Sequence, residues 1–126
     1  MFKDFDISSF KKMKPPGDNT FDTMQEVKEL ESIPLNKKFV KDNDDIEAAF
    51  KKTAKENGVE DYDGKTAAKL IKESAPVILE LKKHFNRPRP KVMAKKMNIN
   101  MKDIEMESMK TPSYPSGHSV QGILIA

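Results

Sequence analysis

The sequence predicts an all-α protein, a single helical bundle formed by a chain of 126 residues. Two observations predict this class. Apolar residues recur at helical spacing in three segments, within residues 21–30, 46–54 and 67–85. Residues 87–116, which follow these segments, lack the alternation of apolar and polar residues that a strand needs. A chain of this length supports one modest hydrophobic core and no second domain.

The first predicted helix follows an irregular arm. Residues 1–18 show no sustained periodicity and close on a Pro-Pro-Gly sequence, which indicates a turn. We therefore place the helical domain at residues 19–126. Its first helix is capped at residues 18–20 and reaches about Ser32, because Pro34 bars its extension.

The second predicted helix runs from residues 42–44 to the Asn-Gly pair at residues 57–58. Its acidic beginning suits the positive end of the helix dipole, and Asn-Gly favours a left-handed stop. A calcium loop at residues 42–47 is the alternative, but this segment lacks the Gly and the final Glu of an EF-hand. We therefore expect these acidic residues to cap a helix.

The longest helix is expected after residues 62–64, with Pro76 inside it. Its predicted apolar face consists of Ala67, Leu70, Ile71, Ala75, Ile78, Leu81 and Phe85. Proline removes one backbone hydrogen bond and clashes with the preceding turn, so we expect a kink. Residues 87–116 form a Pro- and Met-rich loop with a helical turn near residues 92–97, and its methionines are expected to pack rather than to bind a metal. A final, buried helix starts at Ser116.

Basic residues gather between Lys82 and Lys96, although the net charge of the chain is only +3. Such a patch predicts an anionic partner, with a solvated lysine face as the alternative. No segment approaches the roughly 20 apolar residues of a membrane-spanning helix, and the N-terminus lacks the apolar core of a signal peptide. We therefore expect a soluble protein, cytoplasmic rather than secreted. The absence of cysteine excludes disulfides and thiolate metal sites.

The first candidate site lies where the long helix ends. Lys82 belongs to its last turns, and Arg89 follows just beyond them in the sequence Arg87-Pro88-Arg89-Pro90. Each proline disfavours the helical conformation of the residue before it, so both arginines are expected in extended geometry. A guanidinium fork and a compact ammonium group together suit a phosphate. The alternative is a basic helix terminus that complements the helix dipole without a ligand.

The second candidate site is Pro115-Ser116-Gly117-His118, where the loop enters the last helix. Free N–H groups at a helix N-terminus attract anions, Gly117 permits close approach to the backbone, and the Ser116 hydroxyl adds a donor. His118 then lies beside a bound phosphate, where it could protonate a leaving alkoxide. Ordinary capping of the helix by Ser116 is the alternative.

Together, Lys82, Arg89-Pro90 and the segment 115–118 resemble the signature of the phosphatidic-acid-phosphatase type 2 superfamily. This superfamily includes bacterial non-specific acid phosphatases, lipid phosphatases and vanadium haloperoxidases. The resemblance covers residues 82–122 and implies an all-α bundle without a metal cofactor, in which phosphate or vanadate could occupy the site. It implies that the substrate phosphate is held by Lys82, Arg89, Ser116 and the Gly117 amide, and that His118 is the catalytic acid. Arg87 and Lys83 match no defining position and are kept as electrostatic helpers.

The third motif of that superfamily, an Arg followed by a nucleophilic His and its orienting Asp, has no counterpart here. His84 lies on the same predicted helix as Lys82 and lacks an Asp at the required spacing downstream, so it cannot be this nucleophile. We therefore expect the sequence to be truncated inside a core helix, near residues 122–126, and the 126-residue chain to be inactive alone. Otherwise another chain, such as a second copy in a homo-oligomer, would have to cover the apolar C-terminal face.

Three functions are compatible with these patterns. The leading one is an acid phosphatase that hydrolyses small phosphomonoesters through a phospho-histidine in the complete protein. A vanadium-dependent haloperoxidase would use the same anion site, but such enzymes are usually much larger. The third is a non-catalytic module that binds phosphate or another polyanion. Nucleic acid is disfavoured as its ligand, because only Phe85 is available in the basic patch for base stacking.

Overall fold

The computed structural model describes residues 2, 4–102, 104 and 106–126. Within these residues every regular element is a helix, which confirms the predicted all-α class. The elements are α1 (Ile7–Lys11), α2 (Phe21–Ser32), α3 (Lys37–Asn43), α4 (Ile46–Glu56), α5 (Gly64–Phe85), α6 (Pro90–Lys96), the 3₁₀ turn η1 (Glu107–Met109) and α7 (Gly117–Ile125). None of the helices described is both long and apolar enough to cross a membrane.

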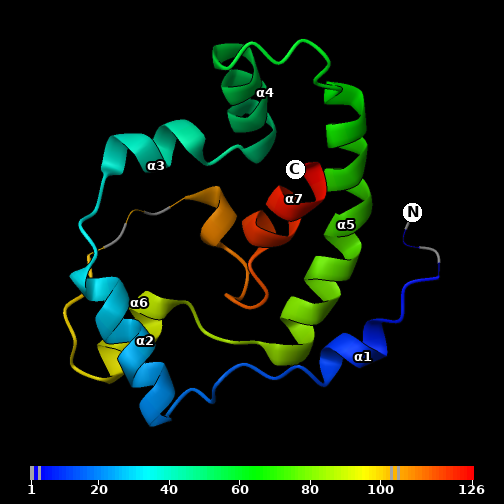
Figure 1. Ribbon diagram of the computed structural model, residues 1–126. Coiled ribbons are helices and arrows are strands. Elements are labelled where there is room, and N and C mark those ends of the chain that lie inside the picture. Colours follow the sequence, from blue (N-terminus) through cyan, green and yellow to red (C-terminus); the bar gives the residue numbers. More distant parts are fainter. Residues whose placement is uncertain (1, 3, 103, 105) are drawn as a thin grey trace.

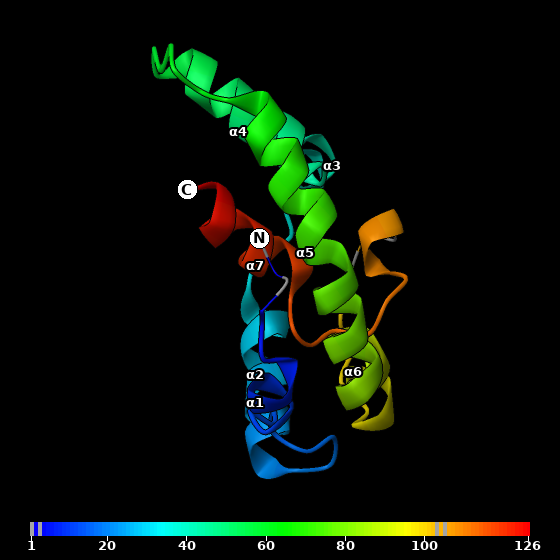
Figure 2. The same cartoon turned by 90° about the vertical axis from the view of Figure 1, so that its right-hand side faces the viewer.

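Helix α5 organises the molecule. It contacts α1, α4 and α7, whereas α2 packs against α6 to one side (Figure 1). Figure 2 shows α4 and the first turns of α5 projecting beyond α7. The first and the last helix of the chain, α1 and α7, both contact α5. The end of α5 and the start of α7 therefore belong to the same part of the fold.

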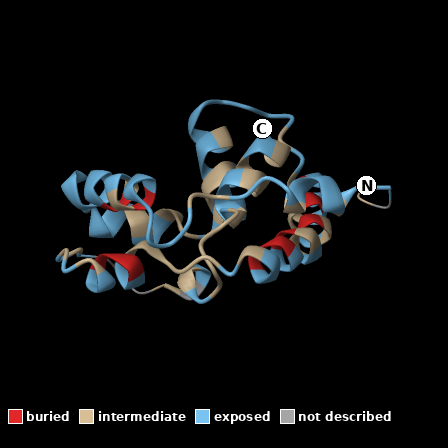
Figure 3. Cartoon of the chain, turned by 90° about the horizontal axis from the view of Figure 1, so that it is seen from below, coloured by how far each residue is buried: buried red, intermediate tan, exposed pale blue. Residues whose placement is uncertain are grey.

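The buried side chains form two small groups rather than the single core that was expected (Figure 3). One group lies along α5 and consists of Ala67, Leu70, Ser74, Ile78, Leu81 and Lys82. The other joins Val27 of α2 to Met93 and Ala94 of α6, with Met97, Ile99 and Met101 packed against it, and Thr23, one turn before Val27 on α2, is also buried. The core is divided because α2 and α6 pack on each other away from α5. The packing role expected for the methionines is confirmed for Met93, Met97 and Met101.

Local capping explains where α2 and α4 begin. Helix α2 starts at its predicted limit, whereas α4 starts at Ile46, later than the predicted residues 42–44, because residues 42–43 belong to α3. The Thr23 amide donates to the side chain of Thr20, the N-cap of α2, at 3.3 Å. The Ala48 amide donates to Asp45 Oδ1, at the N-cap of α4, at 3.1 Å. Asp45 therefore acts as a helix cap, as expected.

Two short helices were not predicted. Helix α1 lies inside the arm that was expected to be irregular, of which residues 1 and 3 lie outside the described part. Lys11 of α1 forms an ion pair with Glu80 of α5 at 3.1 Å. Helix α3 begins at the N-cap Asn36, whose side chain accepts a hydrogen bond from the Phe39 amide. Helices this short are marginal in isolation, so local periodicity alone is a weak signal for them.

Helix α5 matches its predicted limits and continues through Pro76. It ends at Asn86, whose φ of 46° is left-handed. Its buried stripe differs from the predicted apolar face, because Ser74 and Lys82 are buried while Ile71, Ala75 and Phe85 are half-buried. The crossing of α7 thus decides which side of α5 is covered.

Helix α7 starts after its predicted N-cap Ser116, but the expectation that it is buried is wrong. None of its residues is buried, and Ile123 is 80% exposed. Within the described residues, α7 contacts only the helices α5 and α4, so one side of it stays uncovered.

Candidate functional site

Lys82 lies buried in the last turns of α5 and is 4% exposed. Its Nζ donates a hydrogen bond to the carbonyl oxygen of Pro112 at 2.5 Å. Burial and, to a smaller extent, the neighbouring Arg89 guanidinium together lower the pKa of Lys82 to about 8. A buried ammonium group beside a second cation, held by a neutral carbonyl, is an unfavourable arrangement unless an anion joins it.

Arg89 occupies the N-cap position of α6 in extended geometry, as the following proline predicts. Its Nε donates to the Thr111 carbonyl at 2.8 Å, and its Nη2 donates to the Ser108 carbonyl at 2.9 Å. Burial lowers the pKa of Arg89 as well. Lys82 and Arg89 therefore hold the same short segment, residues 108–112, through its carbonyl oxygens. Within the described residues, neither cation is paired with a carboxylate.

The second motif begins α7 beside α5. The Ser119 amide donates to Ser116 Oγ at 3.3 Å, so Ser116 does cap this helix. A Cβ built on Gly117 would lie 3.9 Å from Ile78 Cγ2, which is ordinary contact, so packing alone does not require glycine here. Ile78 is one turn before Lys82 on α5, and residues four apart share a helix face. The N-terminus of α7 therefore meets the face of α5 that carries Lys82.

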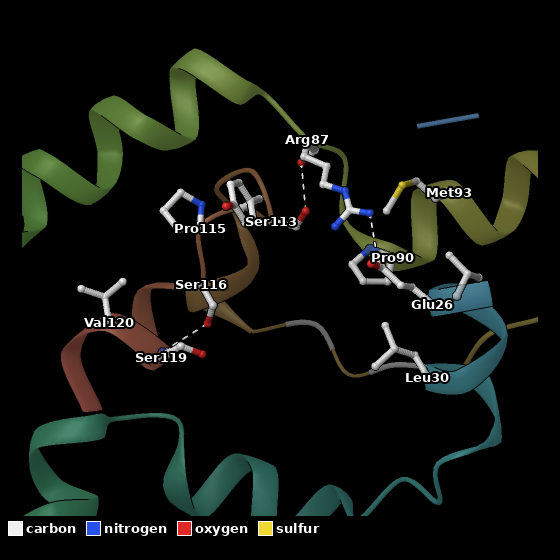
Figure 4. A pocket seen from close by; sticks show the side chains of 12 residues that line it. Glu26, Leu30, Arg87, Pro90, Met93, Ser113, Pro115, Ser116, Ser119 and Val120 are labelled. Carbon is white, nitrogen blue, oxygen red and sulfur yellow. Dashed lines mark hydrogen bonds and ion pairs between the residues drawn. The ribbon is translucent and has the colours of Figure 1, made fainter. Parts of the chain in front are cut away.

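Ser116 and Arg89 line different cavities, although Arg87 and Pro90 of the first motif also line the Ser116 cavity. Ser116 lines a cavity of about 440 Å³ between α2, α6 and α7, walled mainly by apolar side chains (Figure 4). Arg89 lines a neighbouring groove of about 800 Å³. Lys82 lines neither, because its Nζ is turned to Pro112. The structure thus brings the candidate residues to one region, while the Lys82 and Arg89 donors are occupied by residues 108–112.

Arg87 and Lys83, the two suggested helpers, lie in different surroundings. The Arg87 side chain is 12% exposed, and its Nη2 donates to Glu26 at 2.8 Å (Figure 4). The same Nη2 donates to Thr23 Oγ1 at 3.2 Å. The Arg87 carbonyl also accepts a hydrogen bond from the Ser113 amide at 2.9 Å. Arg87 therefore ties α2 to the loop, and Glu26 already offsets its charge. Lys83 is exposed on α5.

His118 has a neighbour that the sequence did not reveal. Its Nε2 lies 4.0 Å from Asp44 Oδ1, at the junction of α3 and α4. Asp44 Oδ1 also accepts a hydrogen bond from Ser108 Oγ at 2.6 Å. No local pattern could have predicted this contact, because the three residues come from separate segments. The other histidine, His84, is exposed and packs edge-on against Phe85 with ring centroids 4.9 Å apart.

No group of three or more His, Cys, Asp or Glu side chains suited to a metal ion occurs among the described residues. Comparison of the chain with protein-family models, with curated proteins and with solved structures finds no match. The resemblance to the phosphatidic-acid-phosphatase type 2 superfamily therefore rests on the two motifs.

Proposed function

We propose that this chain provides the phosphate-binding part of a phosphoric monoester hydrolase. In this proposal Lys82 and Arg89 bind the substrate phosphate, Ser116 and the Gly117 amide complete the site, and His118 protonates the leaving group. One observation carries the proposal: two neighbouring cations, both lowered in pKa by burial, converge on one loop without a carboxylate among the described residues.

The present partners of these cations are chemically similar to phosphate oxygens but weaker. Carbonyl oxygens of Ser108, Thr111 and Pro112 accept the hydrogen bonds of Arg89 and Lys82. These hydrogen bonds already have ionised donors, but their carbonyl acceptors carry no net charge. A phosphate in place of the carbonyls would add negative charge, which attracts both cations and offsets the repulsion between them.

Helix α7 would contribute in two ways. Its nine residues present free backbone N–H groups at the N-terminus, which favour anions. The Ser116 oxygen accepts the Ser119 amide through a lone pair, so its hydroxyl proton can still be donated to a ligand.

The chemistry implied by the resemblance is a two-step transfer. A histidine nucleophile forms a bond to phosphorus as the ester oxygen leaves with a proton from His118, and water then releases phosphate. The motif that carries this nucleophile has no counterpart in the sequence, whose histidines are His84 and His118. The residues described here would thus bind the phosphate and supply the acid.

Phosphate binding by the 126-residue chain tests the first half of the proposal. A calorimetric titration with inorganic phosphate is expected to show binding by the unaltered chain. In Arg89→Met the affinity for phosphate should fall at least about tenfold. Lys72→Met is the matched control, because it removes an exposed cation of α5 that has no role in the proposed site and should change the affinity little. Equal losses in both variants, or no binding by the unaltered chain, would contradict the proposal.

Hydrolysis of an aryl phosphate by protein expressed from the full-length gene tests the second half. His118→Ala is expected to lower kcat by roughly 10²- to 10⁴-fold, the usual contribution of a general acid. Unchanged activity would remove His118 from the mechanism. Vanadate-dependent halide oxidation would instead favour the haloperoxidase. Salt-sensitive binding of single-stranded nucleic acid without phosphate binding would favour a polyanion-binding module.

A further inference from the structure

We infer that Asp44, held by Ser108, positions the His118 ring. This inference rests on the acid role given to His118 in the proposed function. It adds a residue from the α3–α4 junction, far from both motifs in the sequence, to the candidate site.

Three contacts form a continuous connection between the two motifs. Ser108 Oγ donates to Asp44 Oδ1 at 2.6 Å, and the Ser108 carbonyl accepts from Arg89 Nη2 at 2.9 Å. The same Asp44 oxygen lies 4.0 Å from His118 Nε2. Ser108 therefore contacts the guanidinium with its backbone and the carboxylate with its side chain, and so joins the Arg89 site to the His118 site.

Packing between α4 and α7 places Asp44 at this point. His118 and Gly122 are four residues apart and share one face of α7. A Cβ built on Gly122 would lie 3.8 Å from Ile46 Cδ1, so this face meets the first turn of α4. Asp44 precedes Ile46 by two residues and is 26% exposed, which places its carboxylate in the angle between the two helices. The contact is thus a product of helix packing rather than of two free surface side chains.

The neighbouring carboxylates have other partners. Asp42 pairs with Lys38 at 2.6 Å, and Asp45 accepts from the Ala48 amide as the cap of α4. The Asp42 and Asp45 side chains are exposed, whereas that of Asp44 is partly covered. Of these three carboxylates, Asp44 is the one oriented toward α7.

A carboxylate beside one imidazole nitrogen can hold the ring and leave the other nitrogen to the reaction. A separation of 4.0 Å is an ion-pair distance and is longer than a hydrogen bond. Such contacts are often long in sites without ligand and shorten when the substrate binds. With Asp44 on the Nε2 side, Nδ1 of His118 is the nitrogen available to protonate a leaving oxygen.

The test uses the ring signals of the chain's two histidines in NMR spectra, with His84 as internal reference. Asp44→Asn is expected to move the His118 signals and to leave those of His84 in place. Asp42→Asn, which makes the same change of charge two residues away, should leave both in place. Ser108→Ala removes the hydroxyl but keeps the carbonyl that Arg89 holds, so it should move the His118 signals without weakening phosphate binding.

Kinetics of the protein from the full-length gene supply the second readout. Asp44→Asn is expected to lower kcat by roughly 10- to 100-fold with little change in KM, as for other residues that orient a reacting group. His118 signals that respond equally to the two Asp→Asn variants, or that respond to neither, would overturn the inference even if phosphate binds. Absence of phosphate binding with an Asp44-dependent His118 signal would count against the proposed function and still support the contact.

Discussion

Lys82 predicts an unusual dependence of the free energy of unfolding on pH. The residue is 4% exposed, and its pKa is lowered from 10.5 to about 8, first by burial and then by Arg89. Below pH 8 the group is charged in both the folded and the unfolded chain, so the cost of burying the charge is fully present. Between pH 8 and 10.5 the unfolded chain binds one more proton than the folded chain, and stability rises with pH. At about 1.4 kcal/mol per pH unit, the rise amounts to roughly 3 kcal/mol.

Lys82→Met removes this titration and keeps an apolar side chain of similar length. Urea unfolding, followed by circular dichroism from pH 7 to 10.5, is expected to show the unaltered chain gaining roughly 3 kcal/mol relative to the variant. This increase in the free energy of unfolding should occur between pH 8 and 10.5. Lys83→Met is the control, since it removes an exposed lysine from the adjacent position. Its stability should run parallel to that of the unaltered chain across the same range.

Phosphate extends this experiment to the proposed site. A bound anion favours the charged form of Lys82, so phosphate should stabilise the chain more at pH 7 than at pH 10. Parallel curves for the unaltered chain and Lys82→Met would refute the reasoning, because they would mean that the ammonium group is not buried as a cation. A pH-dependent difference that phosphate does not affect would support burial and speak against phosphate binding at Lys82.

Three further predictions concern the framework of the site, and urea unfolding tests each. Ser116→Ala should destabilise the chain by about 1 kcal/mol through loss of the α7 cap, whereas Ser116→Gly should cost only a few tenths. A double-mutant cycle on Arg87→Met and Glu26→Gln should give a coupling free energy of about 1 kcal/mol, and a value near zero would mean that the ion pair does not tie α2 to the loop. Met93→Ala should cost roughly 2–5 kcal/mol, because Met93 is 4% exposed in the α2–α6 core; a cost below about 1 kcal/mol would show that this core is not tightly packed.

Local signals in the sequence were sufficient for the helical class, for the limits of α2 and α5 and for the start of α7. Thr20, Asp45 and Ser116 cap the helices that follow them, and Gly58, just after α4, has a left-handed φ of 67°, as the Asn-Gly pair predicted. Caps, prolines and periodicity act within a few residues of chain, so they can be predicted without knowledge of the fold. For the same reason the sequence alone placed Lys82 at the end of one helix and Ser116 at the start of another.

The partners of the candidate residues were decided by tertiary structure. Local pattern did not indicate that Arg87 binds Glu26, that Lys82 is buried against Pro112, or which face of α5 is covered by α7. The short helices α1 and α3 were also missed, because helices of five and seven residues have little stability of their own.

The contact between Asp44 and His118 shows why helix limits could be predicted from local signals while the partners of the candidate residues could not. It exists because the face of α7 that carries His118 and Gly122 packs against Ile46 at the start of α4, and this packing brings Asp44 to the histidine. Capping and periodicity are properties of a few neighbouring residues, whereas the angle and distance at which two helices cross depend on side chains from all the elements that pack together. The sequence by itself therefore determined where the candidate residues lie along their helices, and the packing of the helices decided which of them meet.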